Sequence, residues 1–306
     1  MSLYNSSAYL REAMDSILSQ TFIDFEFIII DDGSSDNSLE IVRSYTDKRI
    51  VILVNEKNLG SDLSLNKGFD IARGTYIARM DPDDVSMPTR LEEQVKYMDA
   101  HHDVIACGTW TESFGGNRPR IVHKRWTSDN DIKASMLFNT PFTHPSIMLR
   151  RETIEIHHLR YDPTYEHFAD YALWVELAQY GAFANIPEVL FHYRLHEKST
   201  SSVYSSIQKQ GASNLRKGLL EKLGLTPTEE DMVTHNSLSP EKSKSDVWFE
   251  NIRHANKEKN IYSEESLEKI LAARSYLISV TNSTGFIKLW KRFVHAVTTL
   301  FSEKES

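Results

Sequence analysis

The stretch that decides the fold runs from residue 25 to residue 36 and reads FEFIIIDDGSSD. Apart from Glu26, residues 25–30 are apolar, which is typical of a strand buried on both faces. The polar residues that follow, 31–36, favour a turn at the end of that strand. Helical patterns precede and follow this stretch, so it is predicted to be one strand of an alternating α/β chain.

The alternation of strand and helix continues to about residue 100. Further strands are predicted over residues 50–54 and 76–80, with helices between them and after Pro88. Such repetition implies parallel strands joined by right-handed crossovers, and ligands bind such sheets at the carboxyl ends of the strands. Two groups of acids follow strands, Asp31-Asp32 and Asp81-Pro82-Asp83-Asp84. We therefore expect both groups at the same edge of the sheet.

Composition narrows the class of protein. The chain has 306 residues, of which 40% are hydrophobic and 10% aromatic, and this excludes global disorder. A net charge of −8 argues against nucleic acid as a partner. The single cysteine, Cys107, excludes a disulfide framework and a cysteine-based zinc site. Since neither a secretory signal nor a membrane-spanning apolar run is present, we expect a cytoplasmic globular protein.

The chain is expected to contain two regions, an α/β domain over residues 1–205 and a mainly helical extension over 206–306. Residues 226–246 are rich in Thr, Ser, Glu and Lys and are interpreted as a linker or exposed loop. An apolar stripe with basic neighbours covers residues 286–301. Three interpretations of this stripe are open: contact with the inner face of a membrane, docking on the α/β domain, or the interface of a homodimer.

The two groups of acids are candidates for a cation site. Carboxylate oxygens are the ligands that Mg²⁺ and Mn²⁺ prefer. Carboxylates alone would repel a diphosphate, and a metal ion between the two resolves that conflict. The alternative is that Asp, Gly and Ser simply build turns after strands. Two such groups at one predicted edge favour a functional site.

Several short motifs follow one another in a fixed order from residue 4 to residue 196. They are Tyr4-Asn5, Gln20-Thr21-Phe22, Asp31-Asp32-Gly33-Ser34-Ser35-Asp36, Asn58-Leu59-Gly60, Ala72-Arg73-Gly74, Asp81-Pro82-Asp83-Asp84, Thr143-His144-Pro145-Ser146, Asp170-Tyr171-Ala172-Leu173-Trp174 and His192-Tyr193-Arg194-Leu195-His196. This ordered set resembles family 2 glycosyltransferases with a GT-A fold.

The resemblance implies a Rossmann-like α/β domain with a mostly parallel sheet flanked by helices. It implies inverting transfer of a sugar from a nucleoside-diphosphate-sugar, with a UDP-sugar favoured, to a glycan or lipid-linked acceptor. A divalent cation, Mn²⁺ or Mg²⁺, usually assists. Such enzymes commonly build bacterial surface polysaccharide.

The resemblance also implies roles for residues near the nucleotide. Tyr4 resembles the aromatic residue that stacks on the base, and Asp32, with Asp31 beside it, resembles the carboxylate that hydrogen-bonds the base. Asp81 is the first acid of the DxD motif and is expected to face the ribose or the waters of the metal ion.

Two further residues are implied as metal ligands. Asp83, the second acid of the DxD motif, is expected to bind the ion that bridges the diphosphate. His196 matches a histidine that completes the metal shell in some members. Together with Asp81, these residues form the expected metal site.

Asp170 matches the family's catalytic base, which removes the proton of the acceptor hydroxyl as its oxygen attacks the anomeric carbon. It falls at the start of a predicted helix, where the helix dipole favours the ionised carboxylate. The alternative is that Asp170 is merely an N-cap. Ala169 stands where the family commonly has Glu, and Glu166 is a candidate substitute in contacts to the acceptor.

Other interpretations remain beside this one. Only Met1-Ser2-Leu3 precede Tyr4, so the family's first strand is expected to be truncated. A degenerate GT-A domain that binds nucleotide or a partner without turnover is an alternative, supported by Ala169 and the short start. A phosphatase of the haloacid dehalogenase type is disfavoured, because Ile30 stands where its nucleophilic Asp would be needed.

Overall fold

A computed structural model describes residues 1–116, 118–196, 204–238 and 240–283. The chain divides into two compact units. The first comprises residues 1–125 and 142–205, and the second comprises residues 126–141 and 206–306. The second unit therefore includes the segment 126–141, which the sequence analysis counts with the α/β region.

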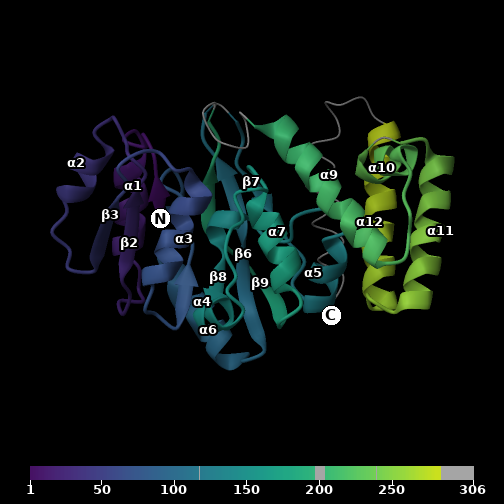
Figure 1. Ribbon diagram of the computed structural model, residues 1–306, viewed down its shortest axis with the longest axis horizontal. Coiled ribbons are helices and arrows are strands. Elements are labelled where there is room, and N and C mark those ends of the chain that lie inside the picture. Colours follow the sequence, from purple (N-terminus) through teal and green to yellow (C-terminus); the bar gives the residue numbers. More distant parts are fainter. Residues whose placement is uncertain (117, 197–203, 239, 284–306) are drawn as a thin grey trace. The chain divides into compact units, whose positions relative to one another are not determined.

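A three-stranded parallel sheet forms one part of the first unit, with the strand order β1-β2-β3 (Figure 1). Its strands are β1 (Ser2–Leu3), β2 (Phe27–Asp31) and β3 (Ile50–Val54). The middle strand, β2, has neighbours on both sides, and its Ile29 and Ile30 are buried, which explains the unbroken apolar run. The short strand β1 pairs Ser2 with Ile30 and Leu3 with Asp31.

Three helices connect or flank these strands: α1 (Leu10–Leu18), α2 (Ser38–Arg43) and α3 (Ser61–Ile71). The apolar side of α1 packs with Met1, Leu3 and β2 in one core cluster. This cluster also includes Met80 and Phe191, which lie beyond the first sheet in sequence. The segment that begins after Met80 is therefore anchored to the core of the first sheet.

A second sheet of six strands has the order β4-β8-β6-β9-β5, with β7 paired to β6 (Figure 1). Its strands are β4 (Tyr76–Ala78), β5 (Val85–Ser86), β6 (Val104–Phe114), β7 (Ile121–His123), β8 (Met148–Arg150) and β9 (Ala182–Arg194). The prediction of a parallel strand over residues 76–80 is wrong, because β4 pairs antiparallel with β8. The sheet is mixed, since β6 and β9 are parallel.

The remaining helical elements of the first unit are α4 (Arg90–Ala100), the 3₁₀ turn η1 (His144–Ser146), α6 (Arg151–Ile156) and α7 (Ala169–Leu177). Helix α4 contributes Leu91 and Met98 to a core cluster with β6, β8 and β9. The Arg90 side chain is also buried, and it donates to the backbone oxygen of Arg79 at 2.8 Å. Helix α4 thereby holds the backbone that follows β4 and leads to the acids at 81–84.

The second unit contains α5 (Asp129–Ser135), α9 (Ser205–Lys222), α10 (Glu229–Asn236), α11 (Lys242–Lys259) and α12 (Glu264–Ser283). The prediction of a linker over residues 226–246 is wrong, because Thr228 and Asp231 form a capping box that begins α10. His235 then joins three segments. Its Nε2–H donates to the Leu137 oxygen at 2.7 Å, and its Nδ1 accepts from Trp248 at 3.1 Å.

The apolar stripe over residues 286–301 lies outside the described residues, so membrane contact, docking on the α/β domain and a homodimer all stay predictions. Among the helices that the structure does describe, none combines the length and apolarity needed to cross a bilayer.

Candidate active site

Three carboxylates converge directly after β4. One oxygen from each of Asp81, Asp83 and Asp84 lies within 4.8 Å of those of the other two, and we call this set the acidic triad. Burial and the neighbouring acids raise the pKa of Asp83 and of Asp84. Asp84 is 1% exposed, and its Oδ2 has no hydrogen-bond partner among the described residues. A cluster of hard oxygen donors with such an unpartnered atom fits a divalent cation.

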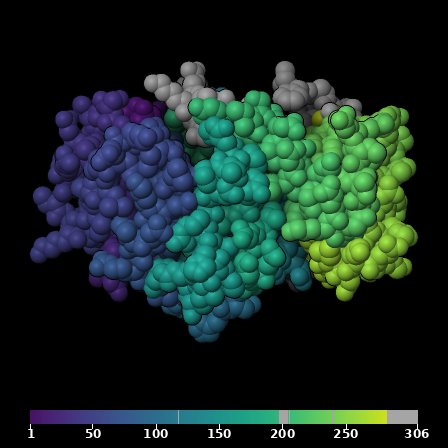
Figure 2. All heavy atoms as spheres, viewed as in Figure 1, coloured from purple at the N-terminus to yellow at the C-terminus, as the bar shows by residue number. Residues whose placement is uncertain are grey.

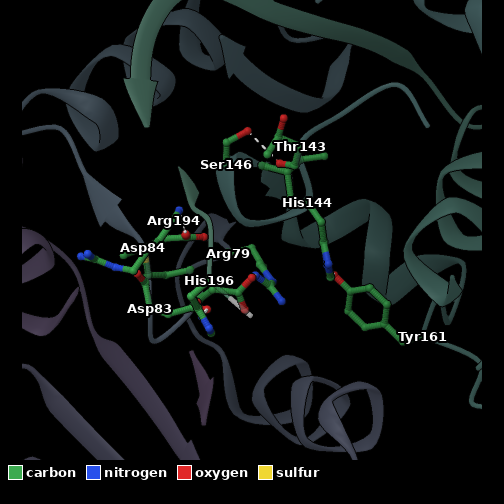
Figure 3. Close-up of polar contacts among 12 residues, drawn as sticks. Arg79, Asp83, Asp84, Thr143, His144, Ser146, Tyr161, Arg194 and His196 are labelled. Carbon is green, nitrogen blue, oxygen red and sulfur yellow. Dashed lines mark hydrogen bonds and ion pairs between the residues drawn. The ribbon is translucent and has the colours of Figure 1, made fainter. Parts of the chain in front are cut away.

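The end of β9 completes the triad's surroundings. The Arg194 backbone N–H donates to Asp84 Oδ1 at 2.7 Å, and its side-chain Nε–H donates to the Asp83 carbonyl oxygen at 2.6 Å. The His196 Nε2 lies 2.8 Å from Asp83 Oδ2 (Figure 3). The pairing of β5 with β9 brings these distant residues together. The structure thus gathers Asp81, Asp83 and His196, the three residues implied as metal ligands.

Arg79 lies between the acidic triad and the pair His144–Tyr161 (Figure 3). Its guanidinium forms an ion pair with Asp81, and the side chain is only 9% exposed. Its Nε has no hydrogen-bond partner among the described residues. The positive charge is close enough to oppose the rise that burial causes in the pKa of Asp170. Arg79 is therefore a buried cation shared by the triad and the expected base.

His144 and Tyr161 form a neutral polar pair on the other side of Arg79. The His144 Nε2 lies 2.8 Å from the Tyr161 hydroxyl. Burial, and then Arg79, lower the pKa of His144 well below its usual value, and burial raises that of Tyr161. Both side chains are therefore uncharged near neutral pH.

Helix α3 fixes the position of Tyr161. The Asn66 side chain accepts from the Tyr161 N–H at 2.9 Å and donates to its carbonyl oxygen at 2.7 Å. Arg160 donates to Asp70 of the same helix at 2.7 Å. Figure 2 shows the corresponding contact between the blue surface around α3 and the teal surface of residues 150–180.

Asp170 lies in the first turn of α7 and is half-buried. Burial raises its pKa to about 6, and the Tyr171 N–H and Arg79 oppose this rise. The expectation that the helix start favours the ionised form is therefore outweighed by burial. The N-cap interpretation is wrong, since Phe168 occupies the N-cap position and Asp170 follows it by two residues.

The Asp32 carboxylate forms hydrogen bonds with other residues of the chain. Its Oδ1 accepts from Asn55 Nδ2 at 2.8 Å and from the Leu59 N–H at 2.9 Å, while Oδ2 accepts from the Gly60 N–H at 2.9 Å. The side chain is 2% exposed. The Asp32 carboxylate therefore fixes the loop that leads into α3. The hydrogen bond expected between Asp32 and a base stays a prediction.

Asp31 and Tyr4 differ in how accessible they are. Asp31 is 1% exposed, and its Oδ2 accepts from the Ser34 N–H at 3.4 Å. Tyr4 is 47% exposed. It lies beside the same turn, because the side chain of its neighbour Asn5 accepts a hydrogen bond from the Ser35 N–H at 2.8 Å. Of these residues, Tyr4 alone offers an accessible surface to a ligand. None of the described hydrogen bonds of Asp31 and Asp32 reaches the acidic triad.

Comparison with known proteins identifies the family. The sequence matches the family description "Glycosyl transferase family 2" over residues 1–158. The chain belongs to glycosyltransferase family 2. It is 32% identical over 300 residues to an uncharacterized glycosyltransferase of Haemophilus influenzae, covering 93% of this chain and 88% of that protein. It is 31% identical over 230 residues to the O-antigen biosynthesis glycosyltransferase WbnJ of Escherichia coli, covering 72% and 88%.

Solved structures confirm the GT-A fold of this glycosyltransferase. TarS of S. aureus, residues 1–349 in complex with UDP-GlcNAc, matches with a TM-score of 0.60 and 16% identity, covering 97% of this chain and 90% of that one. The mannosyltransferase PcManGT of Pyrobaculum calidifontis, in complex with GDP-Man and Mn²⁺, matches with a TM-score of 0.56 and 16% identity, covering 99% and 79%.

The site of this glycosyltransferase includes residues to which the sequence analysis gave no role. Arg79 is a lone charge inside an apolar strand pattern, a signal that could have singled it out. His144 lies in one of the quoted motifs. Its partner Tyr161, and Asn66, which hydrogen-bonds the Tyr161 backbone, had no sequence signal, because only folding brings them together.

Proposed function

We propose that this glycosyltransferase moves a sugar, with inversion, from a nucleoside-diphosphate-sugar to a hydroxyl of a glycan or lipid-linked acceptor, assisted by Mn²⁺ or Mg²⁺. The observation that carries the proposal is the acidic triad with His196 beside it, together with Arg79, whose charge acts on both Asp81 and Asp170. Relatives solved with UDP-GlcNAc, or with GDP-Man and Mn²⁺, support a nucleotide-sugar donor. A UDP-sugar is the donor to test first.

Five residues are proposed to act on the donor. Asp83 and His196 would hold the divalent ion, with Asp81 toward its waters or the ribose. Such an ion would supply neutralising charge for the diphosphate as it leaves. Tyr4 stacks on the base, and Asp32 fixes the loop beside the base.

Asp170 acts as the base at the acceptor end. It takes the proton from the acceptor hydroxyl while the oxygen attacks the anomeric carbon from the face opposite the diphosphate. With a pKa of about 6, it is mostly ionised at pH 7 and still basic enough to accept a proton. We expect kcat to fall about tenfold per pH unit below pH 6.

A thermal-shift screen of nucleoside diphosphates and nucleotide-sugars, with and without Mn²⁺, tests the donor site. A ligand that binds the folded state raises the melting temperature, and we expect a Mn²⁺-dependent rise with UDP or another diphosphate. Asp170→Asn should keep this rise and lose transfer by at least a hundredfold. Normal transfer by Asp170→Asn would contradict the base assignment, and no rise with any nucleotide would contradict the donor site.

The stability of the free protein gives a second test of Asp170. Its pKa is raised from 3.8 to about 6 in the folded state, so its contribution to stability is complete below pH 3.8 and is lost as the pH rises through 6. Asp170→Asn should therefore raise the melting temperature at pH 8 and change it little at pH 4. Equal changes at both pH values would contradict the raised pKa.

A further inference from the structure

A stacked aromatic pair lies beside the end of α7 that carries Asp170. The His167 and Tyr204 rings are 3.7 Å apart between centroids and 17° from parallel. His167 has a φ of +66°, in the left-handed region that residues with a side chain rarely adopt. A strained residue of this kind persists only where its surroundings fix it, and such residues gather at functional sites.

The backbone around His167 is braced against α7. The Phe168 N–H donates to the Tyr165 oxygen at 3.0 Å, and the Tyr171 N–H donates to the Phe168 oxygen at 3.1 Å. The Tyr165 and Phe168 rings also meet edge to face at 5.6 Å. These contacts fix the backbone of His167 relative to Asp170, which follows it by three residues, and the stack places Tyr204 against His167.

The pair remains open to a ligand. Tyr204 is 39% exposed, and the side chain of Glu166 is 73% exposed. The Glu166 Oε1 lies 3.5 Å from His167 Nε2, so a carboxylate stands at the edge of the aromatic surface. A pyranose ring needs both features, because its C–H face packs on an aromatic ring and its hydroxyls donate to a carboxylate.

We infer that His167, Tyr204 and Glu166 form an acceptor subsite that binds a pyranose ring of the acceptor beside Asp170. This inference rests on the proposed function and adds the residues that bind the acceptor and the part of it that they recognise, a pyranose ring. Glu166 supplies next to Asp170 the carboxylate that Ala169 lacks.

The other end of α7 offers a matched control. His157 and Tyr180 stack at 3.7 Å and 18°, and Tyr180 is also 39% exposed. Tyr180 follows the last residue of α7 by three positions, whereas Asp170 lies in the first turn. The two pairs therefore match in geometry and exposure but lie at opposite ends of the helix.

The test compares Tyr204→Ala, Tyr204→Phe and Tyr180→Ala with the unaltered chain. Saturation-transfer NMR measures the binding of methyl glycosides of glucose, galactose, mannose and N-acetylglucosamine in the presence of UDP and Mn²⁺. We expect Tyr204→Ala to weaken glycoside binding about tenfold. Tyr204→Phe and Tyr180→Ala should bind as the unaltered chain does. The Mn²⁺-dependent thermal shift with UDP should stay the same in all variants.

Three results would overturn the inference: unchanged glycoside binding in Tyr204→Ala, an equal loss in Tyr180→Ala, or no glycoside bound by the unaltered chain. Failure of the proposed function is separable, since it would remove the thermal shift with UDP and Mn²⁺ from the unaltered chain as well.

Discussion

The two groups of acids in the first unit look alike in sequence and differ in their partners. Both follow strands, yet Asp32 accepts three hydrogen bonds from the loop 55–60. The acidic triad instead places its carboxylates within 4.8 Å of one another, with Arg79 paired to Asp81. Asp32 of the first group stabilises a loop, whereas the triad keeps charge that a bound cation would relieve. The position of an acid after a strand therefore does not decide its role; the donors around it do.

The largest effect is expected when the triad loses Asp83, the proposed metal ligand. Asp83→Ala should lower kcat/KM at least a thousandfold, because the charge that neutralises the diphosphate would no longer be held. The melting temperature of the metal-free protein should not fall, since the pKa of Asp83 shows that the fold disfavours its charge. Steady-state kinetics and thermal unfolding with and without Mn²⁺ check both expectations. A Mn²⁺ response equal to that of the unaltered chain would contradict the role of Asp83.

Much of this contrast could be predicted from the sequence. The apolar run before Asp31 and the DxD pattern placed both groups at strand ends, and the ordered motifs linked Asp83 with His196, which lie 2.8 Å apart at the two side chains. These signals lie in short stretches of sequence or in the order of the motifs, so they can be recognised without knowledge of the fold.

The rest depended on contacts between distant segments. The burial of Asp32 follows from the approach of Leu59 and Gly60. The role of Arg79 can be recognised only after folding brings Arg194 of β9 and His144 of η1 near it (Figure 3). Likewise, residues 76–80 look like one more parallel strand, but β8 runs antiparallel to residues 76–78 and pairs with them. Composition also suggested a linker where a capping box begins α10. Sequence patterns do not specify such partners.

The next largest effect concerns Arg79, the buried arginine that pairs with Asp81 of the triad. Arg79→Met should destabilise the metal-free protein by about 2–3 kcal/mol, because removing the buried guanidinium leaves the charge of the partly exposed Asp81 uncompensated. Mn²⁺ should restore much of the loss, since it would supply the missing positive charge. Urea unfolding with and without Mn²⁺ measures this. An equal loss in both conditions would mean that Arg79 acts only through packing.

Removing Asp32 should have a comparable effect on stability and should not change the response to metal. Asp32→Ala leaves the Asn55, Leu59 and Gly60 donors without an acceptor, which should cost about 3 kcal/mol and lower the melting temperature by roughly 5–10 °C. The rise with Mn²⁺ and UDP should persist in the folded protein. A loss of that rise at unchanged stability would mean that Asp32 contacts the nucleotide directly.

The smallest expected loss of stability comes from substituting the two glycines near Asp32, one in the turn after β2 and one in the loop 55–60. Comparing them separates the cost of close packing from the cost of backbone strain. Gly33 and Gly60 both have positive φ, +72° and +92°. A Cβ at Gly33 would lie 2.9 Å from the Lys57 carbonyl carbon and 3.0 Å from the Asn58 nitrogen, whereas one at Gly60 would meet nothing within 4 Å. Gly60→Ala should therefore cost about 1 kcal/mol from strain alone, and Gly33→Ala about 2 kcal/mol, because the backbone of residues 57–58 must also shift. Urea unfolding of the two variants measures the difference. Equal losses would show that the turn at Gly33 and the loop 55–60 are not packed tightly enough to act as one unit with Asp32.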